Sequence, residues 1–405
     1  MHSTAPILIT GTESDDPFAI DIGVFCGQAT DIADILSLKT FANSEFCPRF
    51  ISDEKDLTDI GAKLAGATVV VVSTTSNTLT RNELAWRNLL VTRAAKDNGA
   101  KKVVLVEPDL FFSAQDRGPR PEQGDCGSAR DQADYKKFDG QPFTSMFYAQ
   151  SLALAGVDGV ITVHNHSLSV RRLFSKVMPG GIVNLNPAEV FADYIRNSDV
   201  TPSLHNGAGL VVCAPDAGAR EFATQVHEKL GTSSAALLYI AKHRKNERNV
   251  SSFVDTDSPC PLEGIAGKDV IVFDDMVRTG TTIKECCRLL KGAGAGRVVF
   301  FVTHFYSSPE VRESLNHRAL DEIVTTNTLP SILNRDTQGR LRRKLTVLKL
   351  EKWISRYIME HLGFETDHLV GAEYTVDMSS KNPRWVSAGT RYGRQESVLA
   401  GDKCP

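Results

Sequence analysis

Apolar residues along this chain form short continuous runs, and amphipathic stretches of helical period separate them. The clearest runs lie at 67–73 (ATVVVVS), 102–106, 159–163, 209–213 and 270–273. Strands that are apolar on both faces and joined by helices are typical of parallel sheets that are covered on both sides. The pattern therefore predicts an α/β fold of mainly parallel sheets flanked by helices.

The strand and helix rhythm occurs twice, which predicts two domains of similar size. The first run is expected to open with a strand at 22–25 and a short helix at 31–39, and the boundary is expected between Ser167 and Asn184. The remaining predicted helices lie at 82–98, 143–155, 219–230, 282–292 and 351–362, and the remaining predicted strands at 235–241, 297–303, 322–325 and 344–348.

These elements place an N-terminal domain at 20–170, completed by 344–363, and a C-terminal domain at 183–335. Residues 1–19 are polar and expected to be poorly ordered. The stretch at 117–140 is rich in Gly, Pro and Asp and predicts a long loop, and a loop of this length is usually functional or disordered. The extension at 366–405 has no clear periodicity and is left unassigned.

Composition limits the classes of function that need consideration. The chain has 405 residues, 41% of them hydrophobic and 23% charged, and a net charge of −3. Near-neutral charge argues against a large nucleic-acid footprint, and no apolar run approaches the length of a membrane span. The N-terminus lacks the pattern of a signal peptide, and the eight cysteines are scattered without a CxxC pair. We therefore expect a cytoplasmic protein with reduced thiols that binds neither nucleic acid nor membrane.

The most informative chemistry lies at 270–283 (VIVFDDMVRTGTTI), where a strand, an acidic pair, a Thr/Gly turn and a helix follow one another. The turn and the helix N-terminus favour an anion, and Gly280 lets the backbone approach a ligand closely. Carboxylates would repel a phosphate, so Asp274 and Asp275 are expected to face sugar hydroxyls or a divalent cation. The stretch predicts a site for a phosphorylated sugar, although an ordinary turn with Asp and Thr as caps is the alternative.

This stretch resembles the phosphoribosyl pyrophosphate loop of the type I phosphoribosyltransferase fold, which the phosphoribosyl pyrophosphate synthetases share. Five further segments match that ribose-phosphate pyrophosphokinase family in order and approximate spacing, from about Phe25 to Leu348. The resemblance implies two type I phosphoribosyltransferase-like domains. It also implies that the sugar phosphate is bound by Asp274, Asp275, Arg278, Thr279, Gly280, Thr281 and Thr282. Arg278 stands where the family has Asp or Ser, and Thr281 where it has a second Gly.

Two segments resemble the ATP-binding parts of the family. The first, 41–45 (FANSE), is similar to F-S-D-G-E, which implies that Phe41 stacks on adenine while Asn43 and Glu45 contact the edge of the base. Asn43 keeps an acceptor oxygen but lacks the charge of the family Asp.

The second ATP segment is 114–117 (AQDR), which is similar to R-Q-D-R/K. The match implies that Gln115, Asp116 and Arg117 bind ATP and its triphosphate. Ala114 replaces a family Arg, and Arg120 or Arg117 could supply the missing charge. A salt-bridged surface turn is the alternative reading of these four residues.

The segment 164–166 (HNH) follows a predicted strand and resembles the family D-L-H. By position, His166 is implied to contact the metal–ATP complex, while His164 replaces an Asp. Two His residues at i and i+2 of a strand end point the same way, so a transition-metal site is a second possibility. Contact with Mg²⁺-ATP is the interpretation we favour, because Mg²⁺ on ATP is held by few protein ligands.

The segment 214–219 (APDAGA) is similar to the family pyrophosphate loop S-P-D-A-G-G. Small residues in such a loop let backbone N–H groups face phosphates. The resemblance implies that Asp216, Ala217 and Gly218 form this loop, and that Asp216 and His166 help to hold Mg²⁺. A plain turn into a capped helix is the alternative.

The basic segment 242–250 resembles the family's flexible catalytic loop, which implies catalytic roles for Lys242 and Arg244. Positioned cations offset the charge that develops when a pyrophosphoryl group is transferred. A basic run on a loop is otherwise more often solvated surface.

Taken together, the resemblance implies transfer of the pyrophosphoryl group of ATP to the anomeric hydroxyl of ribose 5-phosphate, giving phosphoribosyl pyrophosphate and AMP for nucleotide biosynthesis. It implies Mg²⁺ as cofactor and a homo-oligomer, a dimer or a hexamer. Two alternatives stay open. One is the same chemistry on another phosphorylated sugar or nucleotide-derived substrate, favoured by Arg278, His164 and the loop inserted at 117–140. The other is a non-catalytic regulatory homologue that assembles with active synthetases, favoured by Ala114 and Asn43.

Overall fold

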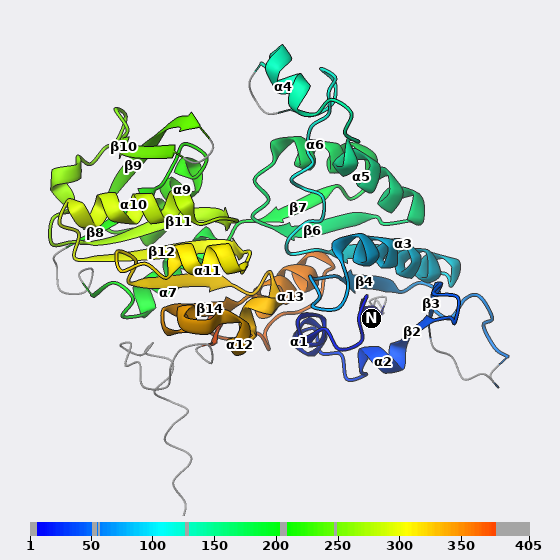
Figure 1. Ribbon diagram of the computed structural model, residues 1–405. Coiled ribbons are helices and arrows are strands. Elements are labelled where there is room, and N and C mark those ends of the chain that lie inside the picture. The colour runs from blue at the N-terminus through cyan, green and yellow to red at the C-terminus, as the bar shows by residue number, and fades with distance from the viewer. Residues whose placement is uncertain are drawn as a thin grey trace, which may run out of the picture. The chain divides into compact units, whose positions relative to one another are not determined.

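In the computed structural model, residues 6–50, 55, 57–125, 129–202, 209–246 and 249–377 are described, and for the stretch 242–252 only the backbone is. The chain divides into two compact units (Figure 1). Unit 1 comprises Met1–Leu185, Thr328–Ser331 and Leu350–Tyr374. Unit 2 comprises Asn186–Asn327, Ile332–Lys349 and Thr375–Pro405.

Unit 1 is built on a parallel sheet in the order β1-β4-β5-β6-β7. Its strands are β1 (Ile7–Gly11), β4 (Thr68–Val72), β5 (Lys102–Val106), β6 (Gly159–Val163) and β7 (Ile182–Leu185). A separate antiparallel hairpin pairs β2 (Leu36–Thr40) with β3 (Phe46–Phe50). Its helices are α1 (Pro17–Phe25), α2 (Ile32–Ile35), α3 (Arg81–Asp97), α4 (Gln132–Lys137), α5 (Thr144–Ala155), α6 (Leu168–Val177) and α13 (Glu351–His361).

Helices α3, α5 and α6 cover one face of this sheet, where their apolar residues share a core with Val69 and Val71 of β4 (Figure 1). Alternate residues of a strand face opposite sides, so Val70 and Val72 are buried on the other face. The late helix α13 packs against α1, and Ser355 Oγ lies 3.4 Å from the Ile22 carbonyl oxygen. Residues far apart in the sequence therefore complete this unit.

Four sequence predictions in unit 1 are wrong. The predicted strand at 22–25 is the last part of helix α1, which Asp16 caps and Pro17 opens, and the supposedly disordered 1–19 holds β1. The predicted helix at 31–39 is one turn, α2, followed by strand β2. The predicted loop at 117–140 contains helix α4, whose cap residue Asp131 accepts a hydrogen bond from the Asp134 N–H at 2.7 Å.

Unit 2 is built on a larger sheet in the order β10-β9-β8-β11-β12-β13-β14-β15. Neighbours from β9 to β14 are parallel, and β10 and β15 add antiparallel edges. Its strands are β8 (Leu210–Ala214), β9 (Ala235–Asn246), β10 (Asn249–Val254), β11 (Asp269–Val277), β12 (Arg297–Phe305), β13 (Glu322–Thr326), β14 (Leu345–Lys349) and β15 (Thr375–Asp377). Its helices are α7 (Ala188–Asn197), α9 (Arg220–Leu230), α10 (Thr281–Gly292), α11 (Pro309–Leu315) and α12 (Arg335–Gln338).

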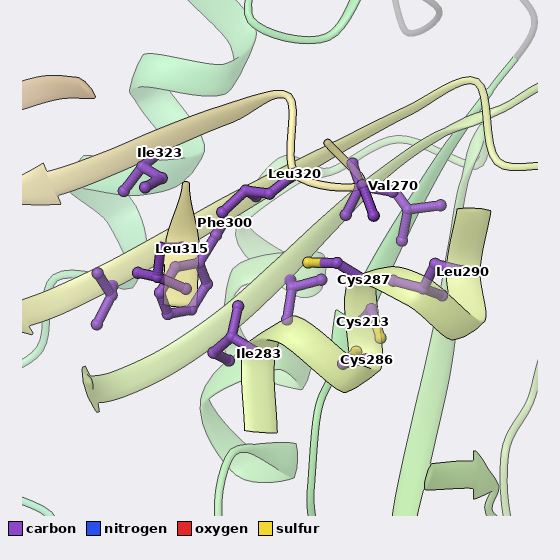
Figure 2. Close-up of a cluster of buried hydrophobic side chains, with 14 of the residues drawn as sticks. Cys213, Val270, Ile283, Cys286, Cys287, Leu290, Phe300, Leu315, Leu320 and Ile323 are labelled. Carbon is purple, nitrogen blue, oxygen red and sulfur yellow. The ribbon is translucent and has the colours of Figure 1, made fainter. Parts of the chain in front are cut away.

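Both faces of this sheet are buried. On one face, Ile283, Cys286 and Leu290 of α10 pack with Val270 of β11 and Phe300 of β12, as Figure 2 shows. On the other face, rings of α7, α9, β11 and β12 pack edge to face or tilted, at centroid distances from 5.2 to 6.2 Å: Phe191, Phe222, Phe273 and Phe301. The predicted α/β fold of mainly parallel sheets with helices on both faces is confirmed.

Two predictions in unit 2 need correction. The strand predicted at 270–273 runs on as β11 to Val277, so the acidic pair lies within it rather than after it. The segment predicted as a catalytic loop at 242–250 continues β9 and returns as β10, with the backbone of Lys242 opposite Ser252 and that of Arg244 opposite Val250. The predicted extension at 366–405 contributes β15, and 378–405 lie outside the described residues.

Within the described part of the chain, we find no helix that is long and apolar enough to cross a membrane.

Candidate functional site

The predicted sugar-phosphate segment and the predicted pyrophosphate loop lie at the same edge of the unit 2 sheet. Strands β8 and β11 are parallel neighbours, with Cys213 opposite Val272. The loop 215–219 leaves the carboxyl end of β8, and Asp274 begins the last part of β11 beside it. The carboxyl edge of an open α/β sheet is where such folds bind ligands.

The carboxylates of the acidic pair, Asp274 and Asp275, are close enough to repel one another. The Asp274 carboxylate accepts a hydrogen bond from the Asp275 N–H at 2.9 Å. Burial raises the pKa of Asp274 well above its ordinary value, and the neighbouring charges of Asp275 and Asp216 raise it further. Three carboxylates from two adjacent strand ends therefore act on one small region, and a cation or sugar hydroxyl donors would relieve their repulsion.

The loop after β8 is organised around Asp216. Its Oδ1 accepts hydrogen bonds from the N–H groups of Gly218 at 3.0 Å and Ala219 at 3.2 Å. Ala217 and Gly218 are exposed, while Ala219 is buried under the start of α9. The predicted members of this loop are thus held in one compact turn next to the acidic pair.

The turn between β11 and α10 requires glycine at one position. Gly280 has φ +76°, and a Cβ there would lie 3.0 Å from Ser314 Cβ and 3.3 Å from Leu315 Cδ2. No side chain among the described residues caps α10 through a hydrogen bond to its first turn. The first N–H groups of α10, with the partly exposed Thr281 and Thr282, are therefore available to an anion.

Arg278 and Thr279 are exposed at the beginning of the same turn. The Arg278 guanidinium lies over the Tyr306 ring, with Cζ 5.9 Å from the ring centroid. This places a cation next to the helix N-terminus, where it adds to the attraction for a phosphate. The predicted catalytic pair, Lys242 and Arg244, lies on β9 of this unit, but their side chains are outside the described residues.

In unit 1, the structure brings two predicted ATP segments together. The Ser167 hydroxyl donates to Asp116 Oδ2 at 2.7 Å, and the Ser169 hydroxyl donates to the Asp116 carbonyl oxygen at 2.8 Å. Arg117 is held by Asp134 of the inserted stretch at 3.3 Å and lies over the Phe138 ring, 4.9 Å from its centroid. Helix α4 thus orients a side chain that the family resemblance assigns to ATP.

The neighbouring segment 164–166 turns sharply after β6. His164 has φ +47°, and its N–H donates to the Leu185 carbonyl oxygen at 2.9 Å. The Asn165 N–H donates to Asn184 Oδ1 at 2.7 Å, which fixes the turn to β7. His166 is exposed at its tip, beside the contact between Ser167 and Asp116. Gln115 is also exposed, and its Oε1 accepts a hydrogen bond from the Thr144 hydroxyl.

The predicted adenine segment forms the tip of the hairpin between β2 and β3. The Phe41 N–H donates to the Glu45 carbonyl oxygen at 2.8 Å, and Asn43 Oδ1 accepts from the Glu45 N–H at 3.2 Å. Ser44 adopts φ +71° at the position of a family Gly. Phe41 is 43% exposed, so its ring is open to stacking, and Lys39 Nζ lies 4.9 Å from its centroid.

Sequence reasoning missed a buried carboxyl group directly upstream of the 114–117 segment. Glu107 accepts hydrogen bonds from Asn88 Nδ2, the Tyr148 hydroxyl and the Phe111 N–H. Burial raises its pKa from 4.5 to about 7. An isolated Glu between a continuous apolar strand and Pro108 was the signal available in the sequence.

A magnesium ion would find hard oxygen donors in unit 2, since Asp216, Asp274 and Asp275 are carboxylates and their mutual repulsion favours a bound cation. Among the described residues, however, no group of three or more His, Cys, Asp and Glu side chains is arranged to hold a metal by itself. Mg²⁺ carried in by a phosphate substrate fits this donor set better than a permanently bound metal. The prediction that His166 and Asp216 hold metal stays a prediction.

Comparisons with known proteins agree with this geometry. A family model described as a phosphoribosyl transferase domain matches residues 188–329, and all of these except 328 and 329 lie in unit 2. The ribose-phosphate pyrophosphokinase of Corynebacterium efficiens is 26% identical over 325 residues, 80% of this chain and 84% of that protein. Ribose-phosphate pyrophosphokinase 2 of Saccharomyces cerevisiae is 28% identical over 286 residues, 70% of this chain and 78% of that protein.

Among solved structures, the phosphoribosylpyrophosphate synthetase of Mycobacterium smegmatis has the same fold, with a TM-score of 0.64 at 22% identity. The match covers 87% of this chain and 97% of that chain. The similarity therefore extends over both units rather than over the family-model match alone.

Proposed function

This chain belongs to the ribose-phosphate pyrophosphokinase family, and we propose that it transfers the pyrophosphoryl group of ATP to ribose 5-phosphate, releasing AMP. The anomeric hydroxyl oxygen of the sugar attacks the β-phosphorus of ATP. The bond from that phosphorus to the α,β-bridging oxygen breaks, AMP leaves, and the hydroxyl proton is released. The product is phosphoribosyl pyrophosphate.

The observation that carries this proposal is the adjacency of two segments at the carboxyl edge of the unit 2 sheet. Asp274 and Asp275 on β11 lie beside the Asp216 loop that follows β8, and the Gly280 turn leads into a helix N-terminus without a side-chain cap. The helix N-terminus with Thr279, Thr281 and Thr282 suits the 5-phosphate, and the acidic pair suits the ribose hydroxyls. A plain strand-to-helix turn would not require three interacting carboxylates.

The residues of unit 1 supply the nucleotide side of the reaction. Phe41 stacks on adenine, with Asn43 and Glu45 at the edge of the base. Gln115, Asp116 and Arg117 bind the triphosphate end with His166. The contact between Ser167 and Asp116 supports this assignment, because it holds two of these segments in one geometry.

Catalysis rests on positioning and charge. Lys242 and Arg244 on the β9–β10 hairpin stabilise the transferring phosphoryl oxygens, and the loop of Asp216, Ala217 and Gly218 orients the pyrophosphoryl group. Mg²⁺, when bound, neutralises phosphate charge, and Asp216 with the acidic pair carries the oxygens that would hold it. No general base is needed if the anomeric hydroxyl is aligned with the leaving group.

The test is AMP release measured over a panel of sugar phosphates with Mg²⁺ and ATP. We expect turnover with ribose 5-phosphate and formation of phosphoribosyl pyrophosphate. Turnover of another phosphorylated sugar with none of ribose 5-phosphate would move the assignment to that sugar, and Arg278 would be the first residue to examine. If the folded protein releases no AMP with any sugar phosphate of the panel, the result supports the non-catalytic alternative.

The homo-oligomeric state, the cytoplasmic location and the lack of nucleic-acid binding stay predictions. Sedimentation of the purified chain with and without Mg²⁺-ATP checks the first of them.

A further inference from the structure

An ion pair joins the start of helix α9 to the base of the β9–β10 hairpin. Arg220 is the first residue of α9 and directly follows the Asp216 loop, while Asp255 directly follows β10. The Arg220 Nη2 is paired with Asp255 Oδ2. Arg220 is 29% exposed and Asp255 is 14% exposed, so this pair is better shielded from water than an ordinary surface pair.

Tyr239 completes the contact from the other strand of the hairpin. The Arg220 guanidinium lies over the Tyr239 ring, with Cζ 5.3 Å from the centroid, which is within the range of a cation–π interaction. The Tyr239 hydroxyl is 2.9 Å from Thr224 Oγ1 on α9, and Thr224 Oγ1 donates to the Arg220 carbonyl oxygen at 2.9 Å. Both the ring and the hydroxyl of Tyr239 thus attach β9 to α9.

Backbone hydrogen bonds also join Tyr239 and Asp255. The Asp255 N–H donates to the Tyr239 carbonyl oxygen at 2.8 Å, one step beyond the last paired residues of the hairpin. Asp255 Oδ1 accepts from the Asp257 N–H at 3.0 Å, and the Tyr239 N–H donates to Ser258 Oγ at 3.0 Å. One carboxylate oxygen of Asp255 is therefore held by the Asp257 N–H, and the other is paired with Arg220.

Arg220 also has an alternative role to consider, because a cation next to a phosphate loop could bind substrate directly. Its charge is already neutralised by Asp255, and Asp257 Oδ2 lies 4.0 Å from Nη1. Its Nε is buried, so this nitrogen is shielded from a ligand. These observations favour a positioning role over a ligand role.

We propose that Arg220, Asp255 and Tyr239 form a clamp that fixes the base of the β9–β10 hairpin to the phosphate loop, and so sets the position of Lys242 and Arg244 for catalysis. The catalytic part rests on the proposed function. The clamp itself does not depend on the proposed function, because it concerns only how firmly the hairpin is held. A small displacement of catalytic groups costs up to about a hundredfold in rate.

The experiment compares the full-length variants Arg220→Gln, Asp255→Asn and Arg220→Lys with wild type. The control is Arg288→Gln, which removes an ion pair with Glu285 on the surface of α10 in the same unit. Amide hydrogen exchange of the paired hairpin residues 240–246 and 249–254 is measured without substrates. Steady-state AMP release then gives kcat and the KM values for ATP and ribose 5-phosphate.

We expect exchange in the hairpin to rise about tenfold in Arg220→Gln and Asp255→Asn, to rise less in Arg220→Lys, and to stay unchanged in Arg288→Gln. We expect kcat to fall by about ten- to a hundredfold while both KM values stay within about twofold, because positioning for the transition state is lost and substrate contacts are kept. The double variant of Arg220→Gln and Asp255→Asn should be no worse than either single variant.

Unchanged hairpin exchange in the Arg220 and Asp255 variants overturns the clamp, whatever the activity. A raised KM for ATP with unchanged exchange overturns it in favour of direct substrate contact by Arg220. If Arg220→Gln does not fold, Tyr239→Phe, which removes only the hydroxyl contact with Thr224, gives the same comparison at smaller amplitude. If wild type forms no AMP, the proposed function fails while the exchange result still decides the clamp.

Discussion

The Ser167 hydroxyl donates a hydrogen bond to the Asp116 carboxylate at 2.7 Å, although 51 positions of sequence separate the two residues. Asp116 follows the turn after β5, and Ser167 opens helix α6 after β6. Because β5 and β6 are parallel neighbours, their carboxyl ends deliver both segments to one edge of the unit 1 sheet. The same serine also caps α6 by accepting from the Val170 N–H at 3.2 Å.

Replacing Ser167 with Ala should weaken ATP binding. A hydrogen bond to a charged group contributes about 1.5–3 kcal/mol, so part of the fixed orientation of Asp116 is lost. We expect the KM for ATP to rise about five- to tenfold with a smaller change in the KM for ribose 5-phosphate. Steady-state kinetics at saturating second substrate measures both.

The matched control for that change is Ser308→Ala. Ser308 caps α11 with the same geometry, accepting from the Val311 N–H at 3.2 Å. Both variants lose a cap, which costs about 1 kcal/mol of stability, so the difference between them isolates the Asp116 contact. Equal KM values for ATP in the two variants would mean that Asp116 does not depend on Ser167.

Replacing Gly280 with Ala should both destabilise unit 2 and impair sugar-phosphate binding. The backbone there is left-handed at φ +76°, and the new Cβ would meet Ser314 Cβ at 3.0 Å. The left-handed conformation alone costs a non-glycine residue about 1–2 kcal/mol. Urea unfolding measures the stability, and the KM for ribose 5-phosphate measures the site.

The control is Gly292→Ala at the other end of α10, where a Cβ meets no heavy atom within 4 Å. Alanine in a helix is favoured over glycine by about 0.5–1 kcal/mol, so this variant should be slightly more stable with unchanged kinetics. A Gly280→Ala variant as stable and active as Gly292→Ala would contradict the assigned turn geometry.

Replacing Asp274 with Asn should stabilise the substrate-free protein while impairing its activity. Burial and the charges of Asp275 and Asp216 make the ionised Asp274 unfavourable, and asparagine removes that repulsion. A gain of about 1 kcal/mol corresponds to roughly 2–4 °C in Tm for a domain of this size. We expect a higher Tm at pH 8 and a KM for ribose 5-phosphate raised at least about tenfold.

The comparison variant is Glu313→Gln, which changes the same charge at an exposed position of α11. Its Tm and KM should match wild type. A lower Tm for Asp274→Asn would mean that the acidic pair stabilises the fold. Repulsion between the carboxylates would then no longer support a bound cation or sugar at this site.

Replacing Lys242 with Ala should reduce kcat by about a thousandfold with little effect on Tm. Cations that stabilise a transferring phosphoryl group contribute mostly to the transition state. The control is Lys229→Ala, which removes a lysine from the exposed end of α9. A kcat equal to that of the control would show that the hairpin assignment is wrong.

The sheets were largely predictable from sequence because each central strand is apolar on both faces. The run at 67–73 and the run at 159–163 became β4 and β6 almost to the residue. Helix α1 was not predicted, because even its exposed positions Ile20 and Val24 are apolar, and a short apolar run fits a strand as well as a helix. The caps Asp16 and Pro17 held the missing information, since an Asp-Pro pair typically starts a helix.

The candidate site was predictable only as separate segments. The residues at 274–282 and 214–219 predicted phosphate binding. No local pattern could reveal that Ser167 donates to Asp116 or that Arg220 pairs with Asp255. Those contacts depend on strand order, which places residues distant in sequence at one sheet edge. Glu107 stood out in the sequence only as an isolated Glu after an apolar strand. Its partners Asn88 and Tyr148 come from α3 and α5, so these contacts also depend on how the chain folds.

Glu107 predicts a specific dependence of stability on pH. Its pKa is raised from 4.5 to about 7 because the side chain is buried, so the folded protein keeps a proton there that the unfolded chain has released. The stability that this proton contributes is fully present below pH 4.5 and is lost as pH rises through 7. The change amounts to about 3 kcal/mol across that window.

The variant Glu107→Gln cannot titrate, so its free energy of unfolding should lack that loss between pH 4.5 and 7. Asp16, whose burial raises its pKa to about 6, contributes a loss of the same sign in both proteins, and the difference between wild type and variant removes it. Urea unfolding at half-unit steps from about pH 4 to about pH 8 measures the two curves. Parallel curves would show that Glu107 is ionised throughout. The hydrogen bonds from Tyr148 and Asn88 would then stabilise a buried carboxylate.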